Sequence, residues 1–155
     1  MNYWDELIKM RDEQRSVSAT GAQVVRGSEL PLEKNGFGRL RWYMHPAKHD
    51  TALSTFVFYE QIVAPGGRSG RLRFQGGNVI YVLAGSGHTW IDGVKHPWRA
   101  GSLLTLPLKR DGIVIQHFNT GSEDARLIAV EPNLFACTTV DRGSGFELLE
   151  PAPAD

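Results

Sequence analysis

The five histidines of this 155-residue sequence are the side chains best suited to acid/base or metal chemistry near neutral pH. Four of them share no spacing known from metal sites, and we interpret them as bystanders: His45, His49, His88 and His96. The fifth, His117, lies in a strongly β-forming segment. A strand could direct this side chain into a protein interior, which makes His117 the leading catalytic candidate.

Nucleophilic chemistry has little support. The single cysteine, Cys137, cannot form a disulfide within the chain, and no histidine lies close enough in sequence to activate its thiol. We therefore interpret Cys137 as a small buried or half-buried residue, typical of a protein from a reducing compartment. The sequence also lacks a phosphate-binding glycine loop, a nucleophile elbow and a paired-cysteine motif.

Composition limits the classes of partner. The sequence has 17 basic residues (lysine plus arginine) and 17 acidic residues (aspartate plus glutamate), so its net charge is zero. Proteins that bind nucleic acid or a membrane surface usually carry a basic excess. Met1 to Val17 has no apolar stretch of the kind a signal peptide needs, and the longest apolar run, Val79 to Ala84, is too short to span a membrane. We expect a cytoplasmic protein without nucleic-acid or membrane partners, and zero net charge favours self-association.

The elements that would position these residues begin with a helix and an arm. Asn2 to Arg15 is predicted to be an amphipathic helix whose apolar stripe must be buried against its own domain or a neighbouring subunit. Val24 and Val25 are compatible with a short strand. Glu29 to Glu33 predicts an extended arm, because Pro31 disfavours a helical conformation of the residue before it.

The rest of the chain alternates β-forming segments with turns such as Pro65-Gly66-Gly67 and the hairpin signal Asp92-Gly93. Strands separated by regular turns are typical of an all-β sandwich or barrel. We divide the chain into a helix and arm (1–38), a β-barrel (39–145) and a C-terminal tail (146–155) whose end is expected to be loose. The predicted strands are Arg39 to His45, Leu53 to Ala64, Arg71 to Gln75, Asn78 to Leu83, His88 to Ile91, Ser102 to Leu106, Val114 to Phe118 and Ala125 to Glu131.

Two groups of residues resemble the conserved motifs of the cupin superfamily. The first is Pro65-Gly66-Gly67 followed by Val79 to Gly87. The second comprises Gly101, Pro107, Gly112 and Asn119. The resemblance spans about Phe56 to Pro132 and implies a double-stranded β-helix, a jelly-roll barrel that is often a dimer.

In metal-bearing cupins the first motif supplies two histidines and a glutamate, and the second supplies a third histidine. The resemblance places these four ligand positions on Leu72, Phe74, Asn78 and Ile115. Because side chains alternate along a strand, Leu72 and Phe74 should point inward, and Arg71 and Arg73 outward. The hydrocarbon side chains cannot ligate a metal, so we expect no metal cofactor and a packed interior at these positions.

The polar candidates for ligand binding or catalysis are few. His117 shares the strand parity of Ile115, so it could orient a ligand or act as a general base, or it could be a core histidine bonded to a backbone carbonyl. Asn78 could bind a ligand or a neighbouring strand, and Gln75 and Tyr81 are weaker candidates. The predicted ligand-binding set is Leu72, Phe74, Asn78, Tyr81, Ile115 and His117.

Three functions remain open. The stretches Gln75 to Tyr81 and Gln116 to Asn119 resemble cupins associated with aromatic-ring dioxygenases of the hydroquinone type, in which a small cupin-like chain accompanies a larger, iron-bearing one. That resemblance implies a non-catalytic small subunit with a metal-bearing cupin as its partner. The alternatives are a homodimeric binding or sensor module for an apolar or aromatic small molecule, and a metal-independent isomerase in which His117 is the base and Glu60 the best available carboxylate.

Overall fold

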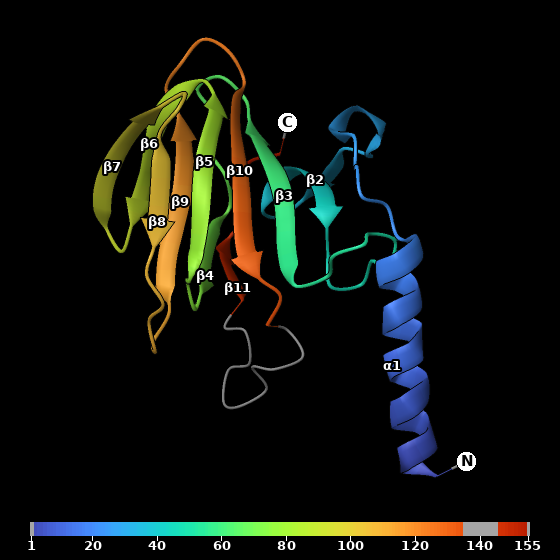
Figure 1. The fold of residues 1–155 in the computed structure, drawn as a ribbon. Helices are drawn as coiled ribbons and strands as arrows, with labels where there is room; N and C mark the ends of the chain where they lie inside the picture. The colour runs from blue at the N-terminus through green and yellow to red at the C-terminus, as the bar shows by residue number, and fades with distance from the viewer. Residues whose placement is uncertain (1, 135–145, 155) are drawn as a thin grey trace.

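The computed structural model of the chain describes residues 2–134 and 146–154 (Figure 1). Within these residues an N-terminal helix and a short 3₁₀ turn precede the strands. The elements are α1 (Tyr3–Thr20), η1 (Gly27–Glu29), β1 (Glu33–Asn35), β2 (Gly38–Met44), β3 (Phe56–Val63), β4 (Arg71–Phe74), β5 (Asn78–Ala84), β6 (Ser86–Ile91), β7 (Val94–Arg99), β8 (Leu103–Leu106), β9 (Ile113–Asn119), β10 (Ala125–Pro132) and β11 (Glu147–Glu150).

The strands form two antiparallel sheets. One has six strands in the order β1-β2-β3-β10-β5-β8, and the other has five in the order β11-β4-β9-β6-β7. Strand β10 lies between β3 and β5, so residues more than sixty positions apart become cross-strand neighbours, as in the pair Ile128 and Glu60. The two sheets enclose one hydrophobic core, and the predicted all-β jelly roll is confirmed.

Strand alternation determines which side chains enter that core. Along β5 burial alternates residue by residue, with Ile80 and Val82 inside and Val79 and Tyr81 outside. The same period of two holds along β10, where Leu127 and the residues of its parity are buried. Core-facing positions are mostly branched aliphatic residues, each of which stabilises the fold by about 1.5–3 kcal/mol on burial.

The predicted hairpin at Asp92-Gly93 joins β6 to β7. Both turn residues have positive φ, 48° for Asp92 and 83° for Gly93. Two consecutive residues in this region match the twist of the flanking strands, and Ile91 pairs directly with Val94. Glycine and short polar residues adopt positive φ at low cost, which is why the dipeptide could be recognised in the sequence.

Three strands were not predicted. Strand β1 begins at the end of the predicted extended arm and pairs with β2. Strand β7 contains Pro97, which argues against a central strand, but β7 lies at the edge of its sheet, where a missing N–H costs no ladder bond. Strand β11 lies within the segment described above only as a tail, and it pairs with β4. Two ion pairs fasten it there, Arg73 to Glu147 at 3.5 Å and Arg71 to Glu150 at 3.7 Å. Conversely, Val24 and Val25 form no strand, and the nearest bridge joins Ala22 to Thr51.

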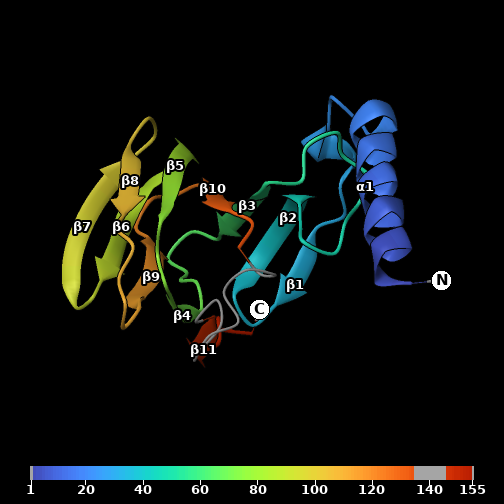
Figure 2. The same cartoon turned by 60° about the horizontal axis from the view of Figure 1, so that its bottom comes forward.

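Helix α1 extends five residues further than predicted. It begins after Asn2, whose side chain accepts a hydrogen bond from the Asp5 amide at 2.9 Å, and it ends at Gly21. No residue of α1 is buried, and the helix lies beyond the β1–β2 edge of the six-stranded sheet (Figures 1 and 2). Its apolar stripe is therefore not covered by its own barrel. Among the described helices, none is long and apolar enough to cross a membrane.

Candidate functional site

Of the four positions to which the resemblance assigns a metal ligand, three are filled by packed hydrocarbon. Leu72, Phe74 and Ile115 are buried in the core, and Leu72 lies opposite Ile115 across the β4–β9 ladder. Arg71 and Arg73 point to the other face and pair with β11, as strand alternation predicted. The barrel is thus packed with apolar side chains at the level where the ligands would converge.

A metal ion does not fit these residues. Within residues 2–134 and 146–154 no three His, Cys, Asp or Glu side chains converge on a common point. Aliphatic and aromatic hydrocarbon has no lone pair to offer, and of the four mapped positions Asn78 alone carries an oxygen. We therefore derive no chemical step through a metal in this barrel.

His117 belongs to a hydrogen-bonded group inside the barrel. Its Nδ1 lies 2.7 Å from Oγ1 of Thr89, which in turn accepts a hydrogen bond from the Trp98 indole N–H at 2.9 Å. Burial lowers the pKa of His117 to about 4, so the ring is neutral at physiological pH. The side chain points inward as predicted, with the Thr89 hydroxyl in the place of the expected backbone carbonyl. Among the hydrogen bonds of the described residues, none joins His117 to a carboxylate.

Asn78 is the polar side chain of the barrel that lacks partners. It begins β5, points inward and is 4% exposed. Its Nδ2 and Oδ1 are both buried without a hydrogen bond from any described residue, so the expected bond to a neighbouring strand is not made. An unsatisfied buried polar group costs roughly 1–3 kcal/mol. Native proteins rarely tolerate that cost without a ligand, a water molecule or a function to account for it.

Glu131 is a second buried polar side chain at this end of the barrel, and the sequence analysis did not identify it. On the β10–β5 ladder the pair Val130 and Val79 is followed by Glu131 and Asn78, both with buried side chains. Glu131 is 6% exposed and forms no ion pair within the described part of the chain. Burial raises the pKa of its carboxyl to about 7. The sequence signal that could have identified Glu131 as inward-facing is its shared strand parity with Ala125, Leu127 and Ala129.

Tyr59 faces Glu131 diagonally from the neighbouring strand. In the β3–β10 register Tyr59 pairs with Ala129, and Glu131 pairs with Val57. Two causes raise the pKa of the Tyr59 hydroxyl well above its usual value: burial is the larger, and the negative charge of Glu131 is the smaller. The phenol therefore remains protonated, and a carboxyl that can gain or lose a proton near neutral pH lies next to it. Tyr59 also escaped the sequence analysis, although it shares the inward parity of Val57.

Aromatic rings surround these two groups and form a small pocket, which we call the mouth pocket. Its volume is about 180 Å³, and its lining includes residues from the start of β3 and the end of β10. The Trp42 ring centroid lies 5.0 Å from that of Tyr59 and 4.9 Å from that of His45. The lining residues are Phe37, Trp42, His45, Pro46, Val57, Tyr59, Glu131 and Phe146.

The mouth pocket and His117 are separate. Phe146 of the pocket contacts Phe74, with ring centroids 5.5 Å apart, and Phe74 pairs with Ile113 at the start of β9. His117 lies four residues further along that strand, or about 13 Å at the usual rise. Packed side chains such as Ile115 fill the interval. Glu131 and His117 therefore cannot act together on one small substrate.

Two further candidates lie on the wrong face. Tyr81 was predicted to bind a ligand, but its side chain is 44% exposed on the outside of β5, because alternation places Asn78 and Ile80 inside. Glu60 also points away from the barrel interior. Its buried carboxylate forms ion pairs with the partly exposed Arg41 at 3.1 Å and Arg126 at 2.5 Å, so it cannot orient His117.

The other histidines have different surroundings. His45, interpreted above as a bystander, lines the mouth pocket. His88 stacks on Phe118 with ring centroids 4.9 Å apart, and His96 is exposed on β7. Cys137 lies outside the described residues.

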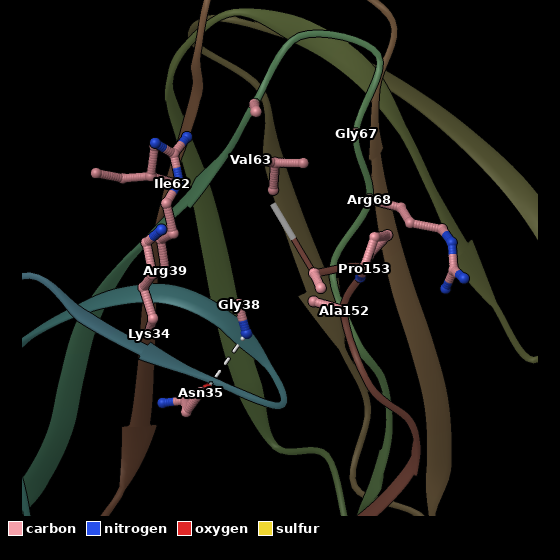
Figure 3. A pocket seen from close by; sticks show the side chains of 12 residues that line it. Lys34, Asn35, Gly38, Arg39, Ile62, Val63, Gly67, Arg68, Ala152 and Pro153 are labelled. Atoms are coloured by element: carbon pink, nitrogen blue, oxygen red, sulfur yellow. Dashed lines mark hydrogen bonds between the residues drawn. The ribbon is translucent and has the colours of Figure 1, made fainter.

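Another depression of the surface lies away from the mouth pocket and carries no converging charge. It measures about 450 Å³ between the β1–β2 turn, the end of β3 and residues 152–154 (Figure 3). Arg39 pairs with Asp124 at 2.9 Å, and Arg68 pairs with Glu150 at 2.7 Å. Figure 3 shows the Arg68 side chain directed away from Lys34 and Arg39, so the three cations do not converge on one bound anion.

Comparison with known proteins identifies the architecture. The sequence matches no family model and no curated protein. Among solved structures, an uncharacterized conserved protein with a double-stranded β-helix domain from Klebsiella pneumoniae aligns over 83% of this chain and 98% of its own, with 17% identity and a TM-score of 0.59. The polyketide cyclase RemF from Streptomyces resistomycificus aligns over 72% and 79%, with 19% identity and a TM-score of 0.58. A Cupin 2 conserved barrel domain protein from Salinispora arenicola aligns over 71% and 88%, with 26% identity and a TM-score of 0.51. What these three share with the chain is the barrel.

Proposed function

We propose that this chain, which has the cupin fold, acts as the metal-free, non-catalytic small subunit of a ring-cleaving dioxygenase of the hydroquinone type, alongside a larger metal-bearing cupin. Two stretches, Gln75 to Tyr81 and Gln116 to Asn119, resemble such cupins, and this resemblance motivates the proposal. The packed hydrocarbon at Leu72, Phe74 and Ile115 supports a role without a metal of its own.

The observation that carries the subunit role is an apolar surface on the outside of the six-stranded sheet, which we call the outer face. It runs across four neighbouring strands, where Tyr81 pairs with both Leu103 and Ile128. A contiguous exposed apolar surface of this kind usually marks a protein interface. The outer face comprises Phe56, Phe58, Val79, Tyr81, Leu83, Leu103, Ile128 and Val130.

Helix α1 supports the same role. Its stripe includes Trp4, Leu7 and Met10, each more than half exposed, and no residue of the helix is buried. An amphipathic helix of this length gains most of its stability from packing its apolar side against another element. A partner subunit that covers α1 or the outer face would supply that packing.

The proposal predicts that a larger cupin is encoded beside this chain's gene, and co-expression of the two chains tests it. We expect the two chains to co-purify, and Tyr81→Lys to weaken their association at least tenfold. The matched control is Trp90→Lys, a similarly exposed aromatic residue on the other sheet, which should have no effect. If no larger cupin is encoded nearby, or if the two chains do not associate, the subunit role is wrong.

Metal content gives a second, independent test. The purified chain is exposed in turn to iron, manganese, nickel and zinc, and its metal is measured by elemental analysis. We expect much less than one equivalent of any metal per chain, because the mapped positions carry no ligand set. One equivalent of a single metal that is lost in His117→Ala would contradict the metal-free assignment.

A second candidate function is favoured by the mouth pocket. The unsatisfied amide of Asn78 and the buried carboxyl of Glu131 support a small-molecule-binding module, alone or as a homodimer, more than an isomerase built on His117. A small molecule that binds the folded chain would stabilise it by RT ln(1 + [L]/Kd), so the unfolding temperature should rise with the logarithm of the ligand concentration above Kd. Turnover of a substrate that is abolished by His117→Ala would favour the isomerase instead.

A further inference from the structure

We propose that the mouth pocket is a binding site for a small organic ammonium ion, which the rings of Trp42, Tyr59 and Phe37 and the carboxylate of Glu131 would hold. The inference gives the second candidate function its class of ligand, and it does not depend on the subunit role. Four observations carry it, namely the arrangement of the rings, the charge of the pocket, its unsatisfied polar neighbour and its size.

The rings meet at steep angles. Trp42 is tilted by 54° to Tyr59 at a centroid distance of 5.0 Å, and Phe37 is at 71° to Tyr59 at 6.3 Å. Rings packed at such angles leave faces uncovered that a parallel stack would cover. A cation within about 6 Å of such a face is attracted by the π electrons, most strongly by tryptophan. The indole N–H donates to Glu33 at 3.2 Å, which helps to hold Trp42 in this orientation.

The charge of the pocket favours a cation. Glu131 is the one carboxyl among the described residues that line it, and none of those residues is a lysine or an arginine. An anionic ligand would meet a carboxylate with no compensating positive charge, whereas an ammonium ion would neutralise it. Because Glu131 is buried, its attraction to a bound cation is screened less than that of a surface carboxylate.

Asn78 is the second polar group on the inner face at this end of the barrel. It is the residue next to Val79, whose partner Val130 precedes Glu131, and both polar atoms of its side chain are buried without a partner from any described residue. Asn78 is not among the residues that line the pocket, so it adds an unsatisfied polar group nearby and not a direct contact. The pocket volume of about 180 Å³ is below the range of about 300–1,000 Å³ typical of drug-sized ligands, so the ligand should have only a few heavy atoms.

The proposal carries a definite pH dependence. Burial raises the pKa of the Glu131 carboxyl to about 7, so the ionised form that attracts a cation is the minor form at pH 6 and the major form at pH 8. Other titratable groups face the pocket from the packed elements, namely Tyr59 from β3 and His45 from the segment after β2. Glu33 and Lys48 line an adjoining depression that shares Trp42 and His45. If the ionised form alone binds, affinity for a cation should rise about tenfold from pH 6 to pH 8.

The test compares choline with its neutral analogue 3,3-dimethylbutan-1-ol by titration calorimetry on the full chain at pH 6 and pH 8. We expect choline to bind about tenfold more tightly at pH 8 than at pH 6, and more tightly than the neutral alcohol at pH 8. Glu131→Gln should abolish the pH dependence and lower choline affinity at least tenfold. Glu123→Gln, which removes an exposed carboxylate elsewhere, should change neither, and His45→Asn should leave the pH dependence in place.

The results that would overturn the proposal are equally definite. Equal or tighter binding of the neutral alcohol would mean that the pocket takes neutral ligands, which retains the binding module and rejects the ammonium site. No detectable binding of choline to the folded chain at either pH would reject the site outright. Trp42→Leu provides a second variant if Glu131→Gln fails to fold. It should weaken choline at least fivefold and the alcohol much less, and an equal loss for both would contradict the role of the ring.

Discussion

Glu131→Gln should stabilise the protein, and the gain should depend on pH. The carboxyl is buried beside Tyr59, and its pKa rises from 4.5 to about 7 on folding. A raised carboxyl pKa means that the folded state holds a proton that the unfolded chain releases between pH 4.5 and pH 7. The free energy of unfolding must therefore fall as pH rises through this window. Glutamine resembles the protonated acid in shape and has no proton to lose, so the variant avoids this loss.

The magnitude follows from the shift. At about 1.36 kcal/mol per pH unit, a rise from 4.5 to about 7 amounts to about 3 kcal/mol. The variant and the wild type should be about equally stable near pH 4.5, and the variant should be more stable by about 3 kcal/mol at pH 8. The wild-type profile alone does not reveal the effect, because the pKa of His117 moves the other way, to about 4. A lowered histidine pKa makes stability rise with pH between about 4 and 6.5, which offsets Glu131 over most of that window.

The assay is urea unfolding at pH 5, 6, 7 and 8, followed by circular dichroism and analysed by linear extrapolation. The quantity of interest is the difference in free energy of unfolding between variant and wild type at each pH, in which the contribution of His117 cancels. Glu123→Gln serves as the control and should give a small difference that does not vary with pH. A difference between Glu131→Gln and wild type that is constant from pH 5 to pH 8 would refute the reasoning.

Three further predictions concern the barrel interior. Thr89→Val removes the hydroxyl between Trp98 and His117 and should destabilise the fold by about 1–3 kcal/mol, because two buried ring nitrogens lose their partner. Urea unfolding would measure this loss, and a change below about 0.5 kcal/mol would contradict a stabilising role of the Thr89 hydroxyl. Ile115→Ala should cost about 2–5 kcal/mol in the same assay, because a side chain buried on all sides leaves a cavity, and a small loss would show that the barrel is hollow there. Asn78→Leu should leave the stability of the ligand-free chain unchanged or higher, because it replaces an unsatisfied amide of similar size, and a marked loss would show that the amide is bonded in solution.

Much of the fold could be predicted from local patterns. β-Forming segments between turns predicted β5 and β10, alternation assigned Leu72 and Phe74 to the buried face of β4, and Asp92-Gly93 marked the β6–β7 turn. These signals are short-range, because side-chain alternation and turn geometry depend on a few neighbouring residues. The strands that were not predicted were missed because local patterns do not report where a strand lies in its sheet. Pro97 lowers the strand propensity of β7, and only the position of β7 at a sheet edge makes the proline tolerable.

The candidate site likewise combines residues that local patterns could identify with residues that only the tertiary structure brings together. From the sequence by itself, strand parity predicted that Leu72 and Phe74 share a face opposite Arg71 and Arg73, and the resemblance to cupins implied that Leu72, Phe74 and Ile115 occupy metal-ligand positions. The sequence could not bring Tyr59, Asn78 and Glu131 together. These residues lie on three strands that become neighbours only because β10 pairs with both β3 and β5. The raised pKa of Glu131 and the unsatisfied amide of Asn78 depend on burial, which the packed barrel supplies and no local pattern encodes.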